Sequence, residues 1–587
     1  MNFCRGKNKA LIILCIFSII LSVNFAYAQN DTAQMPLKDT PGPVETETAF
    51  VTGDIQKQQE WYNFEKYNLV GNWTYSLTNI KMNDNLKEVG KDYAGLNHKL
   101  SYLLMGTSSG WDVSNLADLF YNPWRDRLIA ETFRLEAAKG GTNINIGDFY
   151  PSYSSITLEG LTIRGLGFKR VYYNERLLVQ AFIAQSQKAV EPVKEDKNGN
   201  SVIDQGEDGN GNNILDVKEG DFRQHMMGGR IENKFSRNFS AGANYLAGRD
   251  DISSITNPQS ADPVSGLYPV LNNKVIGLDG HFHFFDDRLK VDSEYGESNY
   301  RKGDKDTTFT DQAVNAKINF LSKWLQSRII YQKVDPNYHS EGNPYLETDK
   351  KGYNFENELI LSKKYSLSGN YEKYNNNVNK LPVDTTIVTK EQEFKLRYYP
   401  ESGSREFKYK KTAKNGTRAN EKDTIDDTYG ITIRKDYSEE TWVTYNLQYI
   451  KYKDNLQNTN DYTGYSAYLS WNWDIKKDKF SLIPYFNYNL YKYKNLDQKQ
   501  IYYLTNIQSR IVLWKNKWVL VPYLEYDYTS QNGSKILERF SRDLESKFYL
   551  SQSVSFSLKY GILNNNDENN NLDYSMEKVG GEITAVF

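Results

Sequence analysis

The stretch YSAYLSWNWDI, residues 465–475, alternates between apolar and polar side chains along its whole length. The polar residues are Ser466, Tyr468, Ser470, Asn472 and Asp474, and the apolar ones are Tyr465, Ala467, Leu469, Trp471, Trp473 and Ile475. Successive side chains of a β-strand point to opposite faces of the sheet. The pattern therefore predicts a strand whose sheet is dry on one face only.

The same alternation recurs at residues 443–449, 518–528 and 554–560, in a chain with 45 tyrosines. Strands of about ten residues with one apolar and one polar face are typical of transmembrane barrels. A soluble β-protein would need a second layer to bury so many such strands, and the sequence shows neither a helical period nor a repeat of fixed length. We predict an all-β, transmembrane antiparallel barrel of about 24 strands, with a range of 22 to 26.

The connections between the predicted strands alternate between short and long. Short turns are expected at 321–324, 362–366, 400–404, 436–440, 474–479, 514–517 and 550–553. Longer loops are expected at 336–352, 411–424, 454–461, 529–535 and 564–571. Barrels of the outer membrane place short turns in the periplasm and long loops outside, so the long loops predict the extracellular side.

The two ends of the chain predict export to the outer membrane. Arg5, Lys7 and Lys9 precede an apolar core and the small-residue site Ala26-Tyr27-Ala28, as in a signal peptide cleaved before Gln29. We expect residues 1–28 to be that peptide, 29–60 a flexible periplasmic segment, and 61–587 the barrel. The ending GGEITAVF, with Phe587 last, resembles the C-terminal signal of Gram-negative outer-membrane barrels. That resemblance implies outer-membrane lipid and the barrel assembly machinery as partners.

Residues 196–219, inside a predicted extracellular loop at 188–221, contain two contiguous copies of a calcium-loop spacing. Positions 1, 3, 5, 7, 9 and 12 of such a loop supply oxygen ligands, with position 7 using its backbone carbonyl. The first copy places Asp196, Asn198, Asn200, Val202, Asp204 and Glu207 there, and the second Asp208, Asn210, Asn212, Ile214, Asp216 and Glu219. The spacing predicts structural Ca²⁺ binding, although an Asn- and Asp-rich solvated loop is the plain alternative.

These two copies resemble the calcium loops of EF-hand, dockerin and thrombospondin type 3 proteins, over about 24 residues. The usual glycine at position 6 is replaced by Ser201 in one copy and Asn213 in the other. Flanking helices are not indicated, so the resemblance implies an ordered loop rather than a calcium sensor.

The sequence gives little indication of a second metal site, of thiol chemistry or of nucleic-acid binding. His281 and His283 share a predicted lumen face with Asp279, where a polar lining is a simpler interpretation than a metal site. Both cysteines, Cys4 and Cys15, lie in the predicted signal peptide, which removes thiol chemistry from the mature chain. The net charge of −2 gives no reason to expect nucleic acid.

The function classes that remain are three. A porin-like channel for a polar solute fits a wide barrel best, since residues 29–60 are too short for a plug domain. A surface-binding scaffold with a blocked lumen is the second, and a barrel hydrolase the third. The segment 147–170, rich in glycine and aromatic residues, resembles segments of uncharacterised large outer-membrane barrels, and its part Phe149–Leu161 is a candidate for folding into the mouth and narrowing it.

Overall fold

The structure is a computed structural model. It describes residues 70–82, 95–108, 110–122, 127–190, 193–194, 217–218, 221–255, 271–302, 308–379, 386–417, 422–568 and 572–587. The predicted signal peptide and periplasmic segment lie outside the described residues.

The described part of the chain forms one sheet of 26 strands. The first seven are β1 (Val70–Met82), β2 (Gly95–Ser108), β3 (Trp111–Asn122), β4 (Arg127–Lys139), β5 (Thr142–Phe149), β6 (Ile163–Tyr172) and β7 (Leu177–Gln187). The next nine are β10 (Arg223–Ser236), β11 (Phe239–Asp251), β12 (Leu271–Phe284), β13 (Leu289–Lys302), β14 (Thr308–Leu321), β15 (Leu325–Val334), β16 (Lys350–Ser362), β17 (Tyr365–Asn375) and β18 (Ile387–Tyr398). The last ten are β19 (Ser404–Gly416), β20 (Asp423–Asp436), β21 (Trp442–Asp454), β22 (Tyr462–Lys476), β23 (Phe480–Tyr493), β24 (Gln498–Leu513), β25 (Trp518–Gln531), β26 (Ser534–Tyr549), β27 (Val554–Asp567) and β28 (Leu572–Val586).

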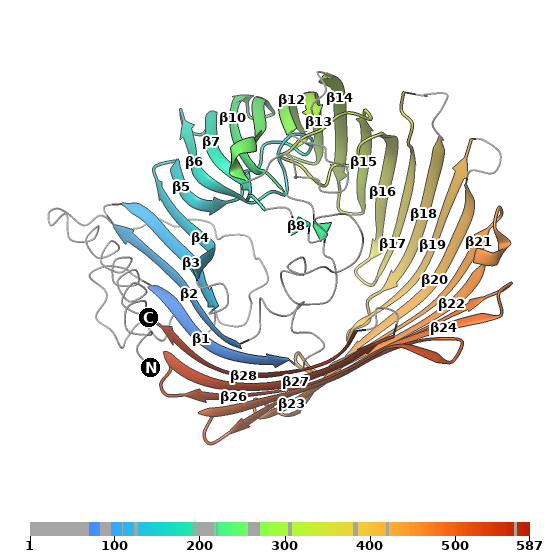
Figure 1. Ribbon diagram of the computed structural model, residues 1–587. Helices are drawn as coiled ribbons and strands as arrows, with labels where there is room; N and C mark the ends of the chain where they lie inside the picture. Colours follow the sequence, from blue (N-terminus) through green and yellow to red (C-terminus); the bar gives the residue numbers. More distant parts are fainter. Residues whose placement is uncertain are drawn as a thin grey trace.

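The sheet closes on itself as an antiparallel barrel (Figure 1). Each strand pairs with its neighbours in the sequence, and β7 pairs with β10 because β8 (Val193–Lys194) and β9 (Val217–Lys218) form a separate hairpin. The last strand β28 pairs with β1, from Asn72 opposite Val586 to Met82 opposite Met576. The predicted fold is confirmed, and the strand number lies at the upper end of the predicted range.

The C-terminal residue takes part in this closure. The amide of Gly71 donates to the carbonyl of Phe587 at 2.8 Å, and the amide of Phe587 donates to the carbonyl of Gly71 at 2.9 Å. The predicted terminal strand is thus the strand that seals the barrel.

Connections between strands fall on two rims. The short-turn rim carries the start of β1, the end of β28 and turns such as 363–364 between β16 and β17. The long-loop rim carries the segments 150–162, 188–222, 335–349 and 455–461. The seven short turns predicted from the sequence all lie on the short-turn rim.

One predicted long loop is wrong. β25 and β26 are joined on the long-loop rim by only Asn532 and Gly533, whose φ angles are 54° and 84°. An Asn-Gly pair with both φ angles positive forms the two-residue turn whose twist matches a hairpin. The predicted loop 411–424 is also shorter than expected, because β19 continues to Gly416 and β20 begins at Asp423.

The two faces of the wall differ in polarity, as β12 illustrates. Ile276 and Leu278 are 56% and 54% exposed on the outer face, whereas the polar Asn273 and Asp279 are buried on the inner face. Most strands have 12 to 16 residues, for example 14 in β12. At about 3.3 Å per residue and a tilt of roughly 40°, such a strand covers about 35 Å, enough for the ~25 Å apolar band of an outer membrane.

Helical structure is confined to two single turns among the described residues, η3 (Ile252–Ser254) and η5 (Asn458–Asn460). No helix in the described ranges is long and apolar enough to cross a membrane.

Candidate functional site

Two loops from the long-loop rim fold into the barrel rather than away from it. We call residues 150–162, between β5 and β6, the first inward loop, and residues 335–349, between β15 and β16, the second inward loop. Both pack against the inner face of the wall formed by β5–β15 (Figure 1). The predicted folding of Phe149–Leu161 into the lumen is therefore observed.

Apolar side chains hold the first inward loop against the wall. Ile156 and Leu158 are fully buried, and Tyr153 packs on Phe182 of β7 with ring centroids 5.9 Å apart. The cluster comprises Phe149, Tyr153, Ile156, Leu158, Ile163, Phe182, Ala184, Met226, Leu246, Val275, Ala313, Val334 and Tyr338. Burying each large side chain in such a cluster contributes about 1.5–3 kcal/mol, so the loop is a packed part of the fold.

The second inward loop hydrogen-bonds the first one inside the lumen. The hydroxyl of Tyr338 donates to the carbonyl of Ile156 at 2.9 Å, and Asn343 Nδ2 donates to the carbonyl of Ser155 at 2.6 Å. Ser340 Oγ donates to the carbonyl of Thr157. Three side chains of one loop thus satisfy three consecutive carbonyls of the other, which fixes their relative position.

The second inward loop is also fixed to the wall. The carbonyl of His339 accepts from Asn273 Nδ2 of β12 at 2.8 Å and from Ser298 Oγ of β13 at 2.6 Å. Asn273 and Ser298 are fully buried, so these bonds are shielded from water. Hydrogen bonds shielded in this way are stronger than those exposed to solvent.

Glycines leave room for the two loops. A Cβ on Gly296 of β13 would lie 2.5 Å from the hydroxyl oxygen of Tyr338. A Cβ on Gly342 would lie 2.5 Å from the carbonyl oxygen of Thr157 and 2.7 Å from Leu246. These approaches are closer than any side chain permits, so glycine is required at both positions.

The first inward loop begins where β5 leaves the wall after only eight residues. Arg164 of β6 bridges the resulting gap in the hydrogen-bond ladder. Its guanidinium contacts Asp148 at 2.5 and 2.6 Å and donates to the carbonyls of Ala130 and Glu131 of β4 at 3.1 and 3.0 Å. The side chain of one residue therefore replaces the strand partner that β4 lacks.

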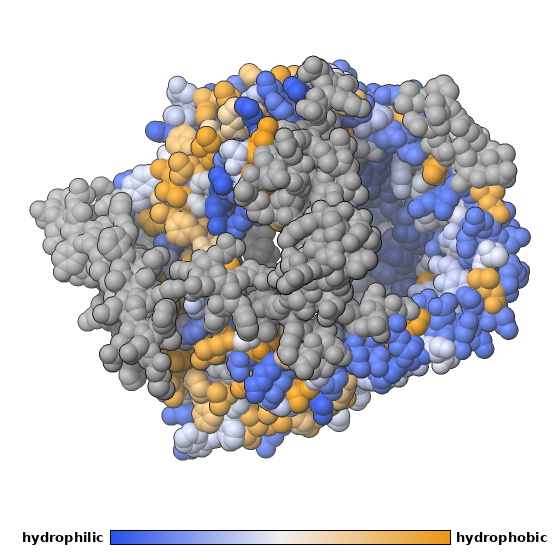
Figure 2. Space-filling model, in the orientation of Figure 1, coloured by the Kyte–Doolittle hydropathy of each residue, from blue (hydrophilic) through white to orange (hydrophobic). Residues whose placement is uncertain are grey.

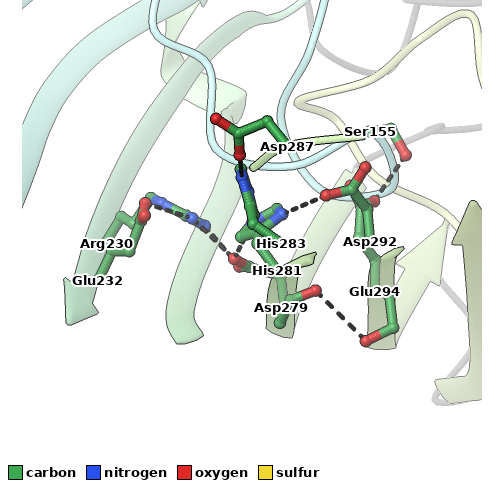
Figure 3. A network of polar contacts seen from close by, with 11 residues as sticks. Ser155, Arg230, Glu232, Asp279, His281, His283, Asp287, Asp292 and Glu294 are labelled. Atoms are coloured by element: carbon green, nitrogen blue, oxygen red, sulfur yellow. Dashed lines mark hydrogen bonds and ion pairs between the residues drawn. The ribbon is translucent and has the colours of Figure 1, made fainter. Parts of the chain in front are cut away.

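A buried ion-pair network lies on the lumen wall beside the first inward loop (Figure 3). Arg230 of β10 contacts both carboxylate oxygens of Asp279 on β12, at 2.6 and 2.8 Å, and Glu232 at 2.9 Å. The ring nitrogens of His281 lie 3.0 Å from Asp279 and 2.8 Å from Asp292. A ring with a carboxylate at each nitrogen donates to both only as the imidazolium.

The network adjoins the tip of the first inward loop. Ser155 Oγ donates to Glu294 of β13 at 2.6 Å and accepts from Asn315 Nδ2 of β14 at 2.8 Å. The serine hydroxyl therefore has a carboxylate acceptor and an amide donor. Among the described residues no serine hydroxyl bonds to a histidine ring nitrogen, so the site offers no activated nucleophile of the Ser-His type.

The two tyrosines of the inward loops give a matched test of this packing. Burial raises the pKa of Tyr153 and of Tyr338, which keeps both hydroxyls neutral. The Tyr338 hydroxyl has an acceptor, while the buried hydroxyl of Tyr153 has no hydrogen-bond partner among the described residues. We expect Tyr338→Phe to lower the free energy of unfolding by about 1–3 kcal/mol, because the carbonyl of Ile156 is left unsatisfied.

Tyr153→Phe removes only an unpartnered hydroxyl, so we expect unchanged or slightly higher stability. Denaturant unfolding of both variants in the same detergent measures the difference. An equal loss in the two variants would show that the hydrogen bond to Ile156 does not hold the loops together.

His281 and His283, which the sequence places on one predicted lumen face, have polar partners. His281 belongs to the ion-pair network, and His283 bonds to Asp287 at 2.6 Å. His98 bonds to Tyr75, and His339 to Glu341. In the described part of the chain, no three His, Cys, Asp or Glu side chains are grouped to hold a metal ion.

All twelve predicted calcium ligands, from Asp196 to Glu219, lie outside the described residues. The structure does describe the base of their loop. Val190 pairs with Asp221, Val193 with Lys218 and Lys194 with Val217. This antiparallel ladder brings the two ends of the segment 195–216 side by side.

The second inward loop is the feature that the sequence did not reveal. Residues 336–352 were expected to be an ordinary long loop, yet Tyr338, Ser340 and Asn343 point at the first inward loop. The usable signal was Gly296, a glycine on an inner-face position of a strand, which marks a place where another segment approaches the wall.

The rest of the lumen is polar. Figure 2 shows a hydrophilic hollow along the inner side of the wall near β17–β20. Inner-face residues there form ion pairs, for example Arg397 with Glu406 at 2.7 Å and Lys410 with Glu391 at 2.9 Å. The wall away from the inward loops is therefore a charged surface that water can reach.

Comparison with known proteins gives similarity at the level of the fold. No protein-family model matches the chain, and no curated protein matches it. Among solved structures it is similar to OccK5 (OpdH) of Pseudomonas aeruginosa, with 12% identity and a TM-score of 0.33 over 65% of this chain and 98% of the other. It is also similar to the P pilus usher PapC translocation pore, with 10% identity and a TM-score of 0.33 over 88% of this chain and 99% of the other.

A third similar structure is a mutant of the ferric enterobactin receptor PfeA of Pseudomonas aeruginosa, in complex with enterobactin. The identity is 10% and the TM-score 0.43, over 89% of this chain and 81% of that one. Values this low do not carry the function of any of these proteins over to this chain. What the protein does has to be inferred from its own barrel.

Proposed function

We propose that this protein is an outer-membrane channel for polar solutes, narrowed by its two inward loops. The observation that carries the proposal is a closed barrel with an apolar outer face and a charged inner face. A closed barrel satisfies every backbone group of the wall, which is the condition for crossing a bilayer as strands.

The outer face supports placement in lipid. Tyr445 and Leu447 of β21 and Leu558 of β27 are 48%, 59% and 54% exposed. Such side chains on every flank of a soluble protein would promote aggregation, whereas a bilayer buries them. The stacked rings of Phe239 and Phe282, 4.6 Å apart near the short-turn rim, suit the aromatic girdle at a membrane interface.

The features of the lumen support the passage of a solute through the barrel rather than storage of a ligand or catalysis. Barrels with more than about 20 strands enclose a lumen that stays open unless something fills it. The inward loops fill the side formed by β5–β15, while the wall near β17–β20 is hollow and hydrophilic (Figure 2). A solute would pass between the packed inward loops and this charged wall.

Liposome swelling with uncharged sugars of increasing size tests the proposal. The mature chain, reconstituted in vesicles, is expected to admit small sugars and to exclude those above a definite size. Vesicles that swell with no sugar, at a confirmed protein content, would remove the channel function. The surface-binding scaffold would then be the better interpretation.

Calcium is the second part of the proposal. The doubled ligand spacing at residues 196–219 supports Ca²⁺ binding that orders this loop, and the ladder at its base holds the two ends of the segment together. Without the ion, the close-set carboxylates repel one another. Millimolar affinity suffices at a cell surface, where calcium sites of extracellular modules operate in that range.

We expect Asp196→Ala combined with Asp208→Ala to abolish calcium binding, because position 1 supplies a carboxylate ligand in each copy. Titration calorimetry on the refolded mature chain measures it. Asp567→Ala with Glu568→Ala is the matched control, since these neighbouring carboxylates, at the end of β27 and directly after it, lie outside the ligand spacing. Calcium binding that survives the first pair of substitutions would exclude the assigned ligands.

A further inference from the structure

The inner face of β13–β18 contains a second feature, a cavity of about 620 Å³ near the short-turn rim. Inner-face residues of six neighbouring strands form one row across it by direct register. Lys290 pairs with Asn319, Asn319 with Arg328 and Arg328 with Glu356, and the row continues to Asn370 and Glu393. Neighbouring strands are about 4.8 Å apart, so the groups are spaced along a groove.

The carboxylates of this cavity are already paired. Glu358 lies 3.3 Å from Arg397, Glu393 lies 2.7 Å from Lys408, and Asp287 lies 2.6 Å from His283. Glu358 and Glu393 therefore each have a cation beside them, and Asp287 has a hydrogen bond to an imidazole ring. The acidic half of the groove is close to neutral, and it does not favour a cationic solute.

At the end of the row formed by β13–β15, the cations share the cavity with Asp287 but do not form ion pairs with it. Arg288 and Lys290 have no carboxylate at ion-pair distance within the described ranges. Arg328 has only Glu356, at 3.6 Å, and its Nε has no hydrogen-bond partner there. A positive potential therefore remains where β13, β14 and β15 line the cavity. Walls of low dielectric concentrate such a potential inside a cleft.

We propose that this cavity is a binding subsite for the anionic group, a carboxylate or a phosphate, of the solute that the channel passes. The inference rests on the proposed channel function and specifies its solute class. Arg288, Lys290 and Arg328 supply charged donors, and Asn319 supplies an amide from the strand between them. Charged N–H donors hold carboxylate and phosphate oxygens about twice as strongly as neutral donors do.

The position of the cavity suits a solute in transit. It lies on the flank of the lumen that continues toward the hydrophilic hollow of Figure 2, near the rim opposite the mouth of the inward loops. A solute that has passed the inward loops meets this subsite before it leaves the barrel. Because the site is open to the lumen, the solute is released again without a conformational change.

Block of single-channel current by anions tests the subsite. Inorganic phosphate and succinate are added separately to the mature chain in a planar bilayer, and the half-blocking concentration of each is measured. In the variant Arg288→Gln with Lys290→Gln, we expect this concentration to rise about tenfold, equivalent to about 1.4 kcal/mol. Block by phosphate alone, or by succinate alone, identifies which anionic group the subsite takes.

The matched control is Lys363→Gln with Lys364→Gln, in the turn between β16 and β17 on the same rim. It removes the same charge but does not line the cavity, so we expect an unchanged half-blocking concentration. Equal shifts in the two variants, or a conducting wild type that neither anion blocks, would overturn the subsite. If the wild type does not conduct, the channel proposal fails independently of the subsite. Phosphate binding to the wild type, measured by calorimetry, would then still support the subsite if Arg288→Gln with Lys290→Gln abolished it.

Discussion

We expect Arg230→Ala to lower the free energy of unfolding of the barrel by about 3–5 kcal/mol, since it removes the bidentate partner of the buried Asp279 carboxylate and leaves only His281 beside it. The side chains of Arg230 and Asp279 are only 5% and 1% exposed, and two hydrogen bonds of 2.6 and 2.8 Å join them. Water cannot replace the lost guanidinium at such a site. Denaturant unfolding in detergent micelles measures the loss.

The double variant Arg230→Met with Asp279→Leu separates the cost of an unpaired charge from the cost of lost packing. It removes both charges together, so we expect it to be more stable than Arg230→Ala alone. A single variant as stable as the wild type would show that the pair is solvated. A double variant less stable than the single one would show that packing, not charge, dominates the site.

We expect removal of the first inward loop to give the largest change in transport. Phe149 and Ile163 are register partners, so replacing residues 150–162 by Asn-Gly joins β5 and β6 through a two-residue hairpin turn. Loss of Tyr153, Ile156 and Leu158 empties the side of the lumen that they fill. Unitary conductance in a planar bilayer should increase severalfold, and liposomes should admit larger sugars.

The matched control shortens another loop of the same rim. Replacing residues 455–461, between β21 and β22, by Asn-Gly removes a segment whose residues 455–460 are exposed rather than packed in the lumen. We expect its conductance to equal that of the wild type. An increase in both variants, or in neither, would contradict the role of the first inward loop as the constriction, provided that both variants show the heat-modifiable migration of a folded barrel.

The strands could be predicted from the sequence because their signal is local. Residues 465–475 alternate in polarity and lie within β22, and the segments 443–449, 518–528 and 554–560 lie within β21, β25 and β27. A barrel wall separates lipid from water at every strand, so each strand carries the full pattern independently of the others. Pairing in sequence order then follows from short antiparallel connections.

The interior of the lumen could be predicted only in part, because it depends on contacts between distant segments. The hydroxyl of Tyr338 donates to the carbonyl of Ile156, which is 182 positions away in the sequence. No local sequence pattern predicts that hydrogen bond. The first inward loop was suggested by its own glycine and aromatic residues, but the second was not. The ion pair of Arg230 and Asp279 likewise joins β10 to β12, two strands that are not neighbours.

The most direct test of the central claim, that this closed barrel is a pore in a membrane, is single-channel recording of the mature chain in a planar bilayer. Recording runs first with calcium and then with a chelator. We predict current steps of stable size, with a change after chelation if the calcium loop lies at the mouth. Silence in both conditions, with folded barrel confirmed in the bilayer, would contradict the channel and leave a surface-binding scaffold.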